Sequence, residues 1–188
     1  MLDSAKPFEQ QRIHIDRNGI SGPSYTAAEG FNKVISEVKT EWVCCGCDDD
    51  FFHTDNLTEL LTWFHNTEVK EDIIYFPIFC GNERDGWKEQ FLLTPTYEGL
   101  RKQNMLPFSC FYRKGLWEKI GGYDNIQFCD WGFWMKALKV GATLYRWEKP
   151  ISYFRQGIEE RLSDKEYKSQ DFEKSRQQLL ERADNYVL

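Results

Sequence analysis

Apolar residues recur at the spacing of an amphipathic helix in two segments of the first half of the chain. Thr26 and Glu29 have the spacing of a capping box, which predicts that a helix begins at this point. The apolar face of this helix consists of Ala27, Ala28, Phe31, Val34, Ile35 and Val38. Residues 55–66 repeat the period, with Leu57, Leu60, Leu61 and Phe64 on one face.

The second half of the chain predicts further helices. Residues 130–140 have helical character and are followed by Gly141, a residue that commonly ends a helix at the C′ position. A shorter helix is expected to end at Gly121 and Gly122. Residues 164–184 are charged with a thin apolar seam, which is typical of a covering helix or an oligomer contact rather than a catalytic element.

Short apolar runs alternate with these helices and have the length and composition of strands. The predicted extended segments are 11–16, 42–47, 72–80, 108–112, 142–147 and 150–155. Residues 81–106 are polar and show no clear period. Strands that alternate with helices predict an α/β sandwich with a mostly parallel central sheet.

Composition narrows the class of protein. A chain of 188 residues predicts a single domain, 1–188, that is large enough for a core without disulfides. Its net charge of −6 argues against a nucleic-acid-binding protein, which needs a basic face. No apolar run reaches the roughly 20 residues of a membrane span, and the first residues lack an apolar signal core. We therefore expect a cytoplasmic protein whose six cysteines are reduced thiols.

The sharpest local feature is the run of three acids after the apolar segment 42–47. Asp48, Asp49 and Asp50 would repel one another, and a divalent cation with a preference for oxygen ligands would remove that cost. Ligands of open α/β sheets bind beyond the carboxyl ends of the strands, where these acids are expected to lie. The alternative interpretation is a solvated acidic turn, or a cap on the next helix.

A second acid, Asp130, lies among the aromatic residues Phe128, Trp131, Phe133 and Trp134. Burial among aromatic rings would raise its pKa, which would suit a general base. The alternative is that Asp130 serves as the N-cap of the helix at residues 131–140. One carboxylate can fill both roles.

The order of these features resembles the family 2 glycosyltransferases, which have the GT-A fold. The matching parts are the acid run, the pair Arg113 and Lys114, the segment I-G-G-Y-D and the later D-W-x-x-W. The resemblance covers residues 11–156, with 157–188 as a C-terminal helical extension. It implies a GT-A-like α/β/α sandwich that transfers a sugar from a nucleotide-diphosphate sugar to a saccharide or lipid-linked acceptor, which allows peripheral contact with a membrane.

The resemblance also implies roles for individual residues. Asp48, Asp49 and Asp50 fall on the D-x-D region that holds Mn²⁺ or Mg²⁺ against the diphosphate, and Asp130 falls on the base that deprotonates the acceptor. Asn32 and Arg113 match positions on the nucleotide-sugar side. The positions that match the acceptor side are Gly121, Gly122, Tyr123, Asp124, Trp131 and Trp134.

The sequence also departs from the family. Cys47, Cys129 and Gly132 stand where acids are common, and Gln156 and Gly157 stand where the family often has a metal-binding His. The family normally begins with a further strand–helix–strand unit of about 30 or more residues that holds the base and ribose. Relative to that pattern the fold is expected to be N-terminally truncated, or completed by a partner chain.

These departures leave alternatives to an active transferase. One is a catalytically inactive or partial transferase-like binding module. A weaker one is a metal-dependent phosphoesterase that uses the acid run. The three histidines, His14, His53 and His65, are scattered, and surface or capping roles are expected for them.

Overall fold

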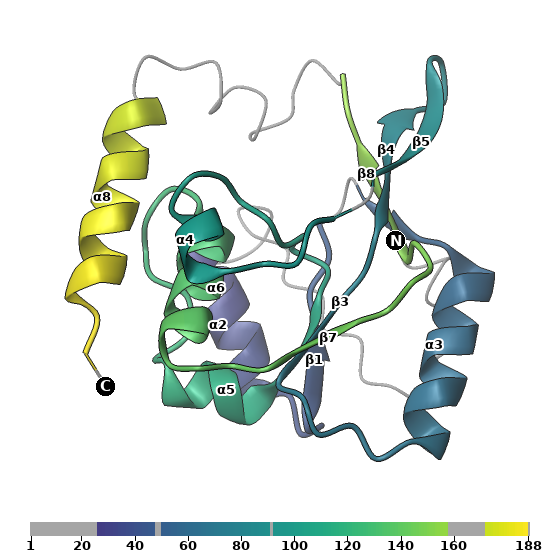
Figure 1. Cartoon of the computed structure of the whole chain (residues 1–188), viewed down its shortest axis with the longest axis horizontal. Coiled ribbons are helices and arrows are strands. Elements are labelled where there is room, and N and C mark those ends of the chain that lie inside the picture. Colours follow the sequence, from purple (N-terminus) through teal and green to yellow (C-terminus); the bar gives the residue numbers. More distant parts are fainter. Residues whose placement is uncertain (1–25, 48–49, 91, 158–171, 188) are drawn as a thin grey trace, which may run out of the picture.

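The computed structural model of the chain describes residues 26–47, 50–90, 92–157 and 172–187 (Figure 1). Its helices are α2 (Ala27–Glu37), α3 (Thr54–Asn66), α4 (Tyr97–Leu100), α5 (Lys114–Lys119), α6 (Cys129–Lys139) and α8 (Phe172–Asn185). Its strands are β1 (Trp42–Cys44), β2 (Phe51–Phe52), β3 (Ile73–Tyr75), β4 (Ile78–Asn82), β5 (Gly86–Gln90), β6 (Phe111–Arg113), β7 (Leu144–Arg146) and β8 (Ser152–Arg155). The predicted α/β class is confirmed.

The described strands form two four-stranded sheets, in the orders β1-β6-β3-β7 and β2-β8-β4-β5. The pairs β3–β7 and β4–β8 are parallel, and the remaining pairs are antiparallel. The described sheets are therefore mixed, which corrects the expectation of a mostly parallel sheet. The reason is that β5 folds back on β4 as a hairpin, while β6 enters between β1 and β3 from the end where both of those strands finish.

Two proline-containing bends connect the sheets. Pro77 separates β3 from β4, and Pro150 precedes β8, so the predicted strand at 72–80 is split in two. Proline lacks the N–H that a continuous ladder requires. Two backbone hydrogen bonds keep the two segments paired through the bends. The Trp147 N–H donates to the Tyr75 carbonyl (2.8 Å), and the Ile151 N–H donates to the Pro77 carbonyl (3.2 Å). A parallel pair thus passes from the first sheet into the second.

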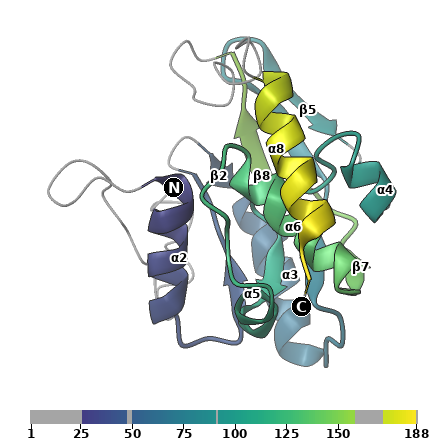
Figure 2. The same cartoon turned by 90° about the vertical axis from the view of Figure 1, so that its left-hand side faces the viewer.

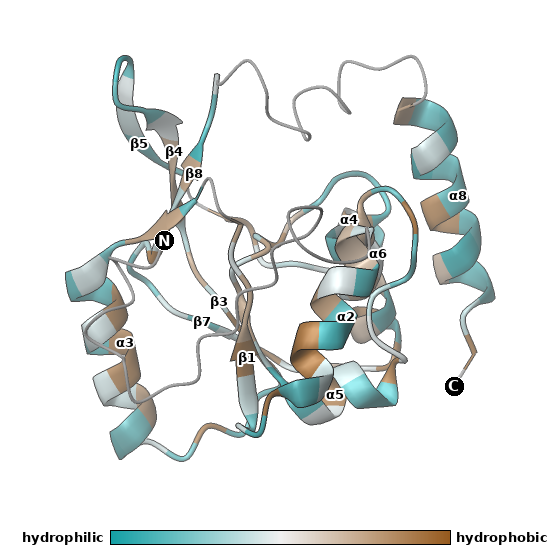
Figure 3. Cartoon of the chain, turned by 180° about the vertical axis from the view of Figure 1, so that it is seen from behind, coloured by the Kyte–Doolittle hydropathy of each residue, from teal (hydrophilic) through white to brown (hydrophobic). Residues whose placement is uncertain are grey.

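Helices cover both faces of the first sheet. Figure 1 shows α3 on one face and α2, α5 and α6 on the other. Alternate residues of β3 point to opposite sides: Ile73 joins the cluster under α6, and Ile74 joins the cluster under α3. Figure 3 shows the apolar side of α3 turned toward the sheet. No helix in the described ranges is long and apolar enough to cross a membrane.

The last helix, α8, forms an outer layer that packs against α6 (Figure 2). Leu179 and Ala183 are its buried residues, and they belong to the main core cluster. Lys139 of α6 donates to the backbone carbonyls of Ala183 and Asp184 near the C-terminal end of α8. The predicted covering role of the C-terminal helix is confirmed over residues 172–185.

Most predicted elements are present, with shifted ends. The capping box of α2 is formed by Thr26 and Glu29 as predicted. Strand β5 and helix α4 lie inside the segment 81–106 that showed no period, because both are short and largely polar. The predicted strand at 11–16 lies outside the described residues, as does the beginning of the predicted helix at 164–184.

Candidate active site

The acid run follows β1, and its last residue, Asp50, lies beside β8. The Asp50 carboxylate accepts the backbone N–H of Arg155 at 3.2 Å, and its own N–H donates to the Cys47 carbonyl at 3.3 Å. Asp48 and Asp49 lie outside the described residues. Within the described ranges, no three His, Cys, Asp or Glu side chains are grouped to hold a metal ion. The three carboxylates together have the hard oxygen donors that Mg²⁺ and Mn²⁺ prefer.

Asp130 is half-buried in the first turn of α6. The helix begins at Cys129, and its N-cap is Phe128 with φ 61° and no side-chain cap bond, so the N-cap alternative for Asp130 is wrong. The ring of Phe128 packs against Phe172 and Trp131, which holds this unusual backbone in place. The start of α6 therefore has aromatic contacts and no side-chain cap bond.

The surroundings of Asp130 act on its pKa in two opposite directions. Burial raises the pKa of Asp130 above its ordinary value. Hydrogen bonds from the Trp131 backbone N–H, from the Asn104 side chain and from its own N–H act in the opposite direction, because they stabilise the ionised form. The Asn104 amide nitrogen lies 3.0 Å from Asp130 Oδ2. The net effect is a raised pKa, which makes the Asp130 carboxylate a stronger proton acceptor than an exposed aspartate.

A short bridge of residues before β6 connects Asp130 with the end of β1. The Cys110 thiol interacts electrostatically with both Asp130 and Cys44. The Cys44 thiol donates to the Ser109 carbonyl at 3.1 Å. The Ser109 hydroxyl lies 2.7 Å from that of Ser152, the first residue of β8. These contacts place Asp130 and Cys110 near Cys44, at the carboxyl end of β1, and place Ser109 beside the first residue of β8.

The predicted G-G-Y-D turn is built by contacts from two helices. Gly121 and Gly122 have φ values of 73° and 71°, which favour glycine. A Cβ on Gly122 would lie 2.5 Å from Asn32 Oδ1. Asn32 accepts the Tyr123 N–H at 2.8 Å and the Trp117 Nε1–H at 3.0 Å, and donates to the Tyr123 carbonyl at 2.8 Å. Both ends of the Asn32 amide are therefore engaged within the fold.

Asp124, the last residue of this turn, pairs with a buried lysine. Lys136 is only 3% exposed, and its ammonium donates to Asp124 Oδ1 at 3.0 Å. It also donates to the carbonyls of Ile120 and Gly122. This set of acceptors satisfies the buried charge. The motif thus has a structural role in joining the turn to α6.

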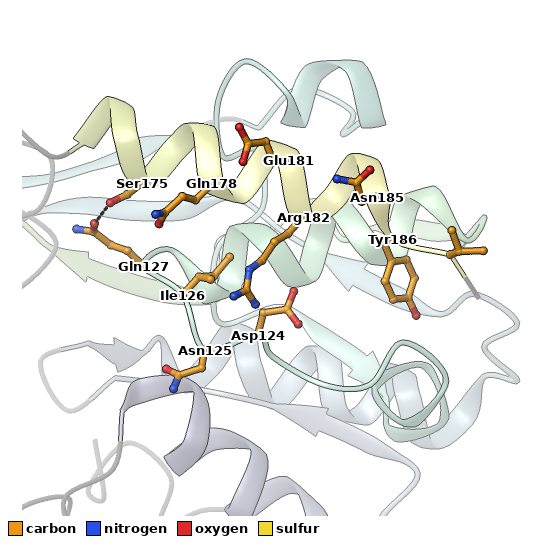
Figure 4. A pocket seen from close by; sticks show the side chains of 11 residues that line it. Asp124, Asn125, Ile126, Gln127, Ser175, Gln178, Glu181, Arg182, Asn185 and Tyr186 are labelled. Atoms are coloured by element: carbon orange, nitrogen blue, oxygen red, sulfur yellow. Dashed lines mark hydrogen bonds between the residues drawn. The ribbon is translucent and has the colours of Figure 1, made fainter.

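Asp124 also lines an open polar groove of about 930 Å³ between residues 124–127 and α8 (Figure 4). Ser175 donates to Gln127 across it. The Tyr186 ring lies 5.5 Å from the Lys136 ammonium. Of the predicted acceptor-side residues, Asp124 lines this groove.

Two other predicted acceptor-side residues are core residues. Trp131 and Trp134 are 2% and 0% exposed. Trp131 Nε1–H donates to the Leu100 carbonyl at 2.7 Å, which ties α6 to α4. Trp134 Nε1 is buried without a hydrogen-bond partner. Tyr123 is 3% exposed, and its hydroxyl lies 3.1 Å from that of Tyr112. The surface available to a sugar from these three side chains is therefore very small.

Arg113 lies at the opposite end of β6 from Cys110. It pairs in register with Trp42, the first residue of β1, and its guanidinium stacks 4.6 Å from the Trp42 ring. Its Nε–H donates to the Glu71 carbonyl at 3.0 Å, and it pairs with Glu41. The structure thus places Asp50 beside β8 of the second sheet and Asp130 in the first turn of α6, and it places Arg113 at the end of β6 that faces away from Cys110.

An aromatic row that the sequence reasoning did not find lies beside Asp50. Phe51, Tyr153 and Phe79, from β2, β8 and β4, stack in turn at 4.4 and 4.7 Å. Trp87 of β5 meets Phe51 and Tyr153 edge-on at 5.4 and 4.9 Å. Cross-strand register produces this row, and register is not readable from residue spacing alone.

The described histidines and the cysteines have ordinary structural roles. His53 is the N-cap of α3 and accepts the Asn56 N–H at 3.3 Å, so a capping role is confirmed for it. All six cysteines are free thiols. Burial raises the pKa of Cys45 to about 11.

Comparisons with known proteins support the fold. No protein-family model matches the sequence, and no curated protein matches it. The structure of S. aureus TarS 1–349 superposes with a TM-score of 0.53 at 14% identity, over 68% of this chain and 40% of that one. A second S. aureus TarS structure gives 0.55 at 14% identity, over 86% of this chain and 28% of that one.

The chain therefore spans less than half the length of either TarS structure. TarS is a glycosyltransferase, and the fold described here is glycosyltransferase-like. At this identity the likeness concerns the fold.

Proposed function

We propose that the chain is an inverting, metal-dependent glycosyltransferase of the GT-A type that resembles family 2. Its substrates would be a nucleotide-diphosphate sugar and a saccharide or lipid-linked acceptor. The observation that carries this proposal is Asp130 in the first turn of α6, a half-buried carboxylate whose pKa is raised by burial and which accepts the Asn104 amide, within a glycosyltransferase-like fold. A cytoplasmic location, with peripheral contact to a membrane for a lipid-linked acceptor, is part of the proposal.

In the proposed reaction Asp130 takes the proton from the acceptor hydroxyl. The acceptor oxygen forms a bond to the anomeric carbon as the bond between that carbon and the diphosphate oxygen breaks. The electron pair of the broken bond leaves with the nucleoside diphosphate. Attack from the face opposite the leaving group inverts the anomeric configuration. A base of raised pKa is suited to the first step because a higher pKa makes the carboxylate a stronger proton acceptor.

Asp48, Asp49 and Asp50 would hold Mn²⁺ or Mg²⁺. Their position after β1 supports this assignment, as does the place of Asp50 beside β8. The ion would stabilise negative charge on the leaving diphosphate.

A second candidate function is a transferase-like binding module without turnover. The observation that favours it is that Asn32 and Arg113, the residues matched to the nucleotide-sugar side, are engaged within the fold. Under this alternative the groups that hold the nucleotide come from a partner chain or are absent.

The test combines binding with turnover. Thermal unfolding of the full chain is followed with a panel of nucleotide-diphosphate sugars, with and without Mn²⁺, because a bound ligand raises Tm. Release of nucleoside diphosphate is then measured with saccharide acceptors. We expect a Mn²⁺-dependent rise in Tm, and turnover that falls at least a hundredfold in Asp130→Asn. Asp49→Asn is expected to lose the Mn²⁺-dependent rise.

Asp55→Asn is the matched control, because this exposed carboxylate lies in the first turn of α3 and has no role in the site. It should leave both measurements unchanged. Donor binding without turnover in the wild-type chain would favour the binding module. Full turnover in Asp130→Asn would exclude the proposed mechanism.

A further inference from the structure

Asn104 lies in the segment between α4 and β6 and meets Asp130 across 26 positions of the sequence. Its amide nitrogen donates to Asp130 Oδ2 at 3.0 Å, and its amide oxygen accepts the Leu106 N–H at 3.3 Å. The second bond fixes the orientation of the amide, because only the oxygen can accept a backbone N–H. The NH₂ group is thereby directed at the carboxylate.

The segment that carries Asn104 is anchored on both sides. Leu100 and Leu106 are 0% and 2% exposed and belong to the main core cluster. The Leu100 carbonyl accepts the Trp131 indole N–H, and the Arg101 carbonyl accepts Arg176 of α8 at 3.0 Å. Asn104 is therefore presented to Asp130 from a fixed backbone.

Among the described residues, Asn104 is the one side chain that donates to this carboxylate. The titratable group beside Asp130 is the Cys110 thiol, from the segment before β6. Near the helices that pack on α6, Arg101 and Tyr97 both bond Asp184, and Arg176 pairs with Glu173. On α6 itself, Lys136 bonds Asp124 and Lys139 bonds the end of α8. No cation of the described ranges pairs with Asp130.

We propose that Asn104 is a positioning residue for Asp130, which holds the carboxylate in one orientation and stabilises its ionised form. Its role in catalysis rests on the proposed function of Asp130 as the base. The hydrogen bond opposes the effect of burial on the pKa of Asp130, and it does so without an ion pair that would block the approach of an acceptor hydroxyl.

The direct test is a titration that needs no substrate. The chain is labelled with ¹³C at aspartate carboxyl carbons, and the Asp130 resonance is assigned by its loss in Asp130→Asn. We expect the titration midpoint of Asp130 to rise in Asn104→Ala, because the bond that stabilises the ionised form is removed. Asn125→Ala is the matched control, since Asn125 is exposed and, among the described residues, its side chain bonds Glu29 at 3.4 Å rather than Asp130.

An unchanged midpoint in Asn104→Ala, or an equal rise in Asn125→Ala, would overturn the proposal. Should Asn104→Ala fail to fold, Asn104→Ser keeps a polar group that is too short to make the same bond, and the same rise is expected. Because the titration measures the folded chain alone, its outcome stands whether or not the chain proves to be a transferase.

The pH dependence of sugar transfer provides a second measurement. We expect the acidic limb of the pH profile of kcat/KM to move to higher pH in Asn104→Ala, with about a tenfold loss on that limb for one hydrogen bond to a charged group. The KM for the donor should stay the same, whereas a loss confined to donor KM would contradict a role at the base.

Discussion

Asn32 of α2 and Tyr123 exchange two hydrogen bonds of 2.8 Å, although 91 positions of sequence separate them. The Asn32 amide behaves like a segment of backbone: it accepts the Tyr123 N–H and donates to the Tyr123 carbonyl. The turn after α5 is thereby attached to α2, and α6 follows from it a few residues later. The geometry that presents Asp130 therefore depends in part on an asparagine near the beginning of the described chain.

Replacing Asn32 by Ala should destabilise the fold. Three hydrogen bonds are lost, and the Tyr123 N–H and carbonyl are left in a part-buried place, so we expect the free energy of unfolding to fall by about 2 kcal/mol. Urea unfolding followed by circular dichroism measures this. A variant with wild-type stability that loses only its response to nucleotide sugars would instead assign Asn32 to donor binding.

The two glycines of the turn should differ in their tolerance of Ala. Both have positive φ, so each substitution carries a similar backbone penalty. A Cβ on Gly122 also clashes with the Asn32 carboxamide, whereas a Cβ on Gly121 meets nothing within 4 Å. We expect Gly121→Ala to lower the free energy of unfolding by about 1 kcal/mol and Gly122→Ala by about 2 to 3 kcal/mol. Equal losses by thermal unfolding would show that Asn32 moves aside freely.

The raised pKa of Asp130 predicts a pH-dependent effect of Asp130→Asn on stability. A carboxyl group whose folded pKa lies above its unfolded value binds its proton more tightly in the folded state. Its contribution to stability is fully present below the unfolded pKa and is lost as the pH rises through the folded pKa. Asp130→Asn should therefore raise Tm at pH 7.

The same difference in Tm should shrink as the pH falls below the ordinary pKa of an aspartate, because protonation removes the charge whose burial is unfavourable. Asp55→Asn, at an exposed position, gives the baseline. A drop in Tm at pH 7 for Asp130→Asn would mean that the ionised carboxylate stabilises the fold.

The thiols near the candidate site should be unreactive in the folded chain. Burial raises the pKa of Cys45 to about 11, and burial raises the pKa of Cys44 and Cys110 well above the ordinary value. Because the thiolate is the reactive form, we expect iodoacetamide at pH 8 to modify these three cysteines only after unfolding. Peptide mass spectrometry of native and denatured samples measures this. Rapid native alkylation of Cys45 would show that the core under β1 opens readily.

Local patterns were sufficient for the helices. The capping box at Thr26 and the apolar period of α3 each depend on residues within a few positions of one another, and both helices begin within a residue of the predicted point. The beginning of α6 was also predicted to within a residue, although the packing of Phe128 against Phe172, 44 positions away, was not predicted, and the short helix α4 was missed. The hairpin of β4 and β5 was missed because its strands carry little periodicity of their own.

The residues of the candidate site also include some that the local sequence predicts and others that it does not. The sequence singled out Asp50 and Asp130, whose chemistry is visible in their neighbours along the chain. Asn104 has no motif around it, and only the docking of α4 on α6 brings its amide to Asp130. Conversely, Trp131 and Trp134 were predicted on the acceptor side from the resemblance, whereas the packing of α6 places both side chains in the core.

By itself, the sequence determined the α/β class, the positions of the main helices and the two acids around which a function can be proposed. These features follow from hydrophobic period, capping and local charge, which act between near neighbours. The tertiary structure alone decided that the sheets are mixed, that Arg113 lies away from the acids, and that Asn104 meets Asp130. Those outcomes depend on strand register and helix docking, whose energies arise between residues far apart in the chain and leave no periodic trace in the sequence.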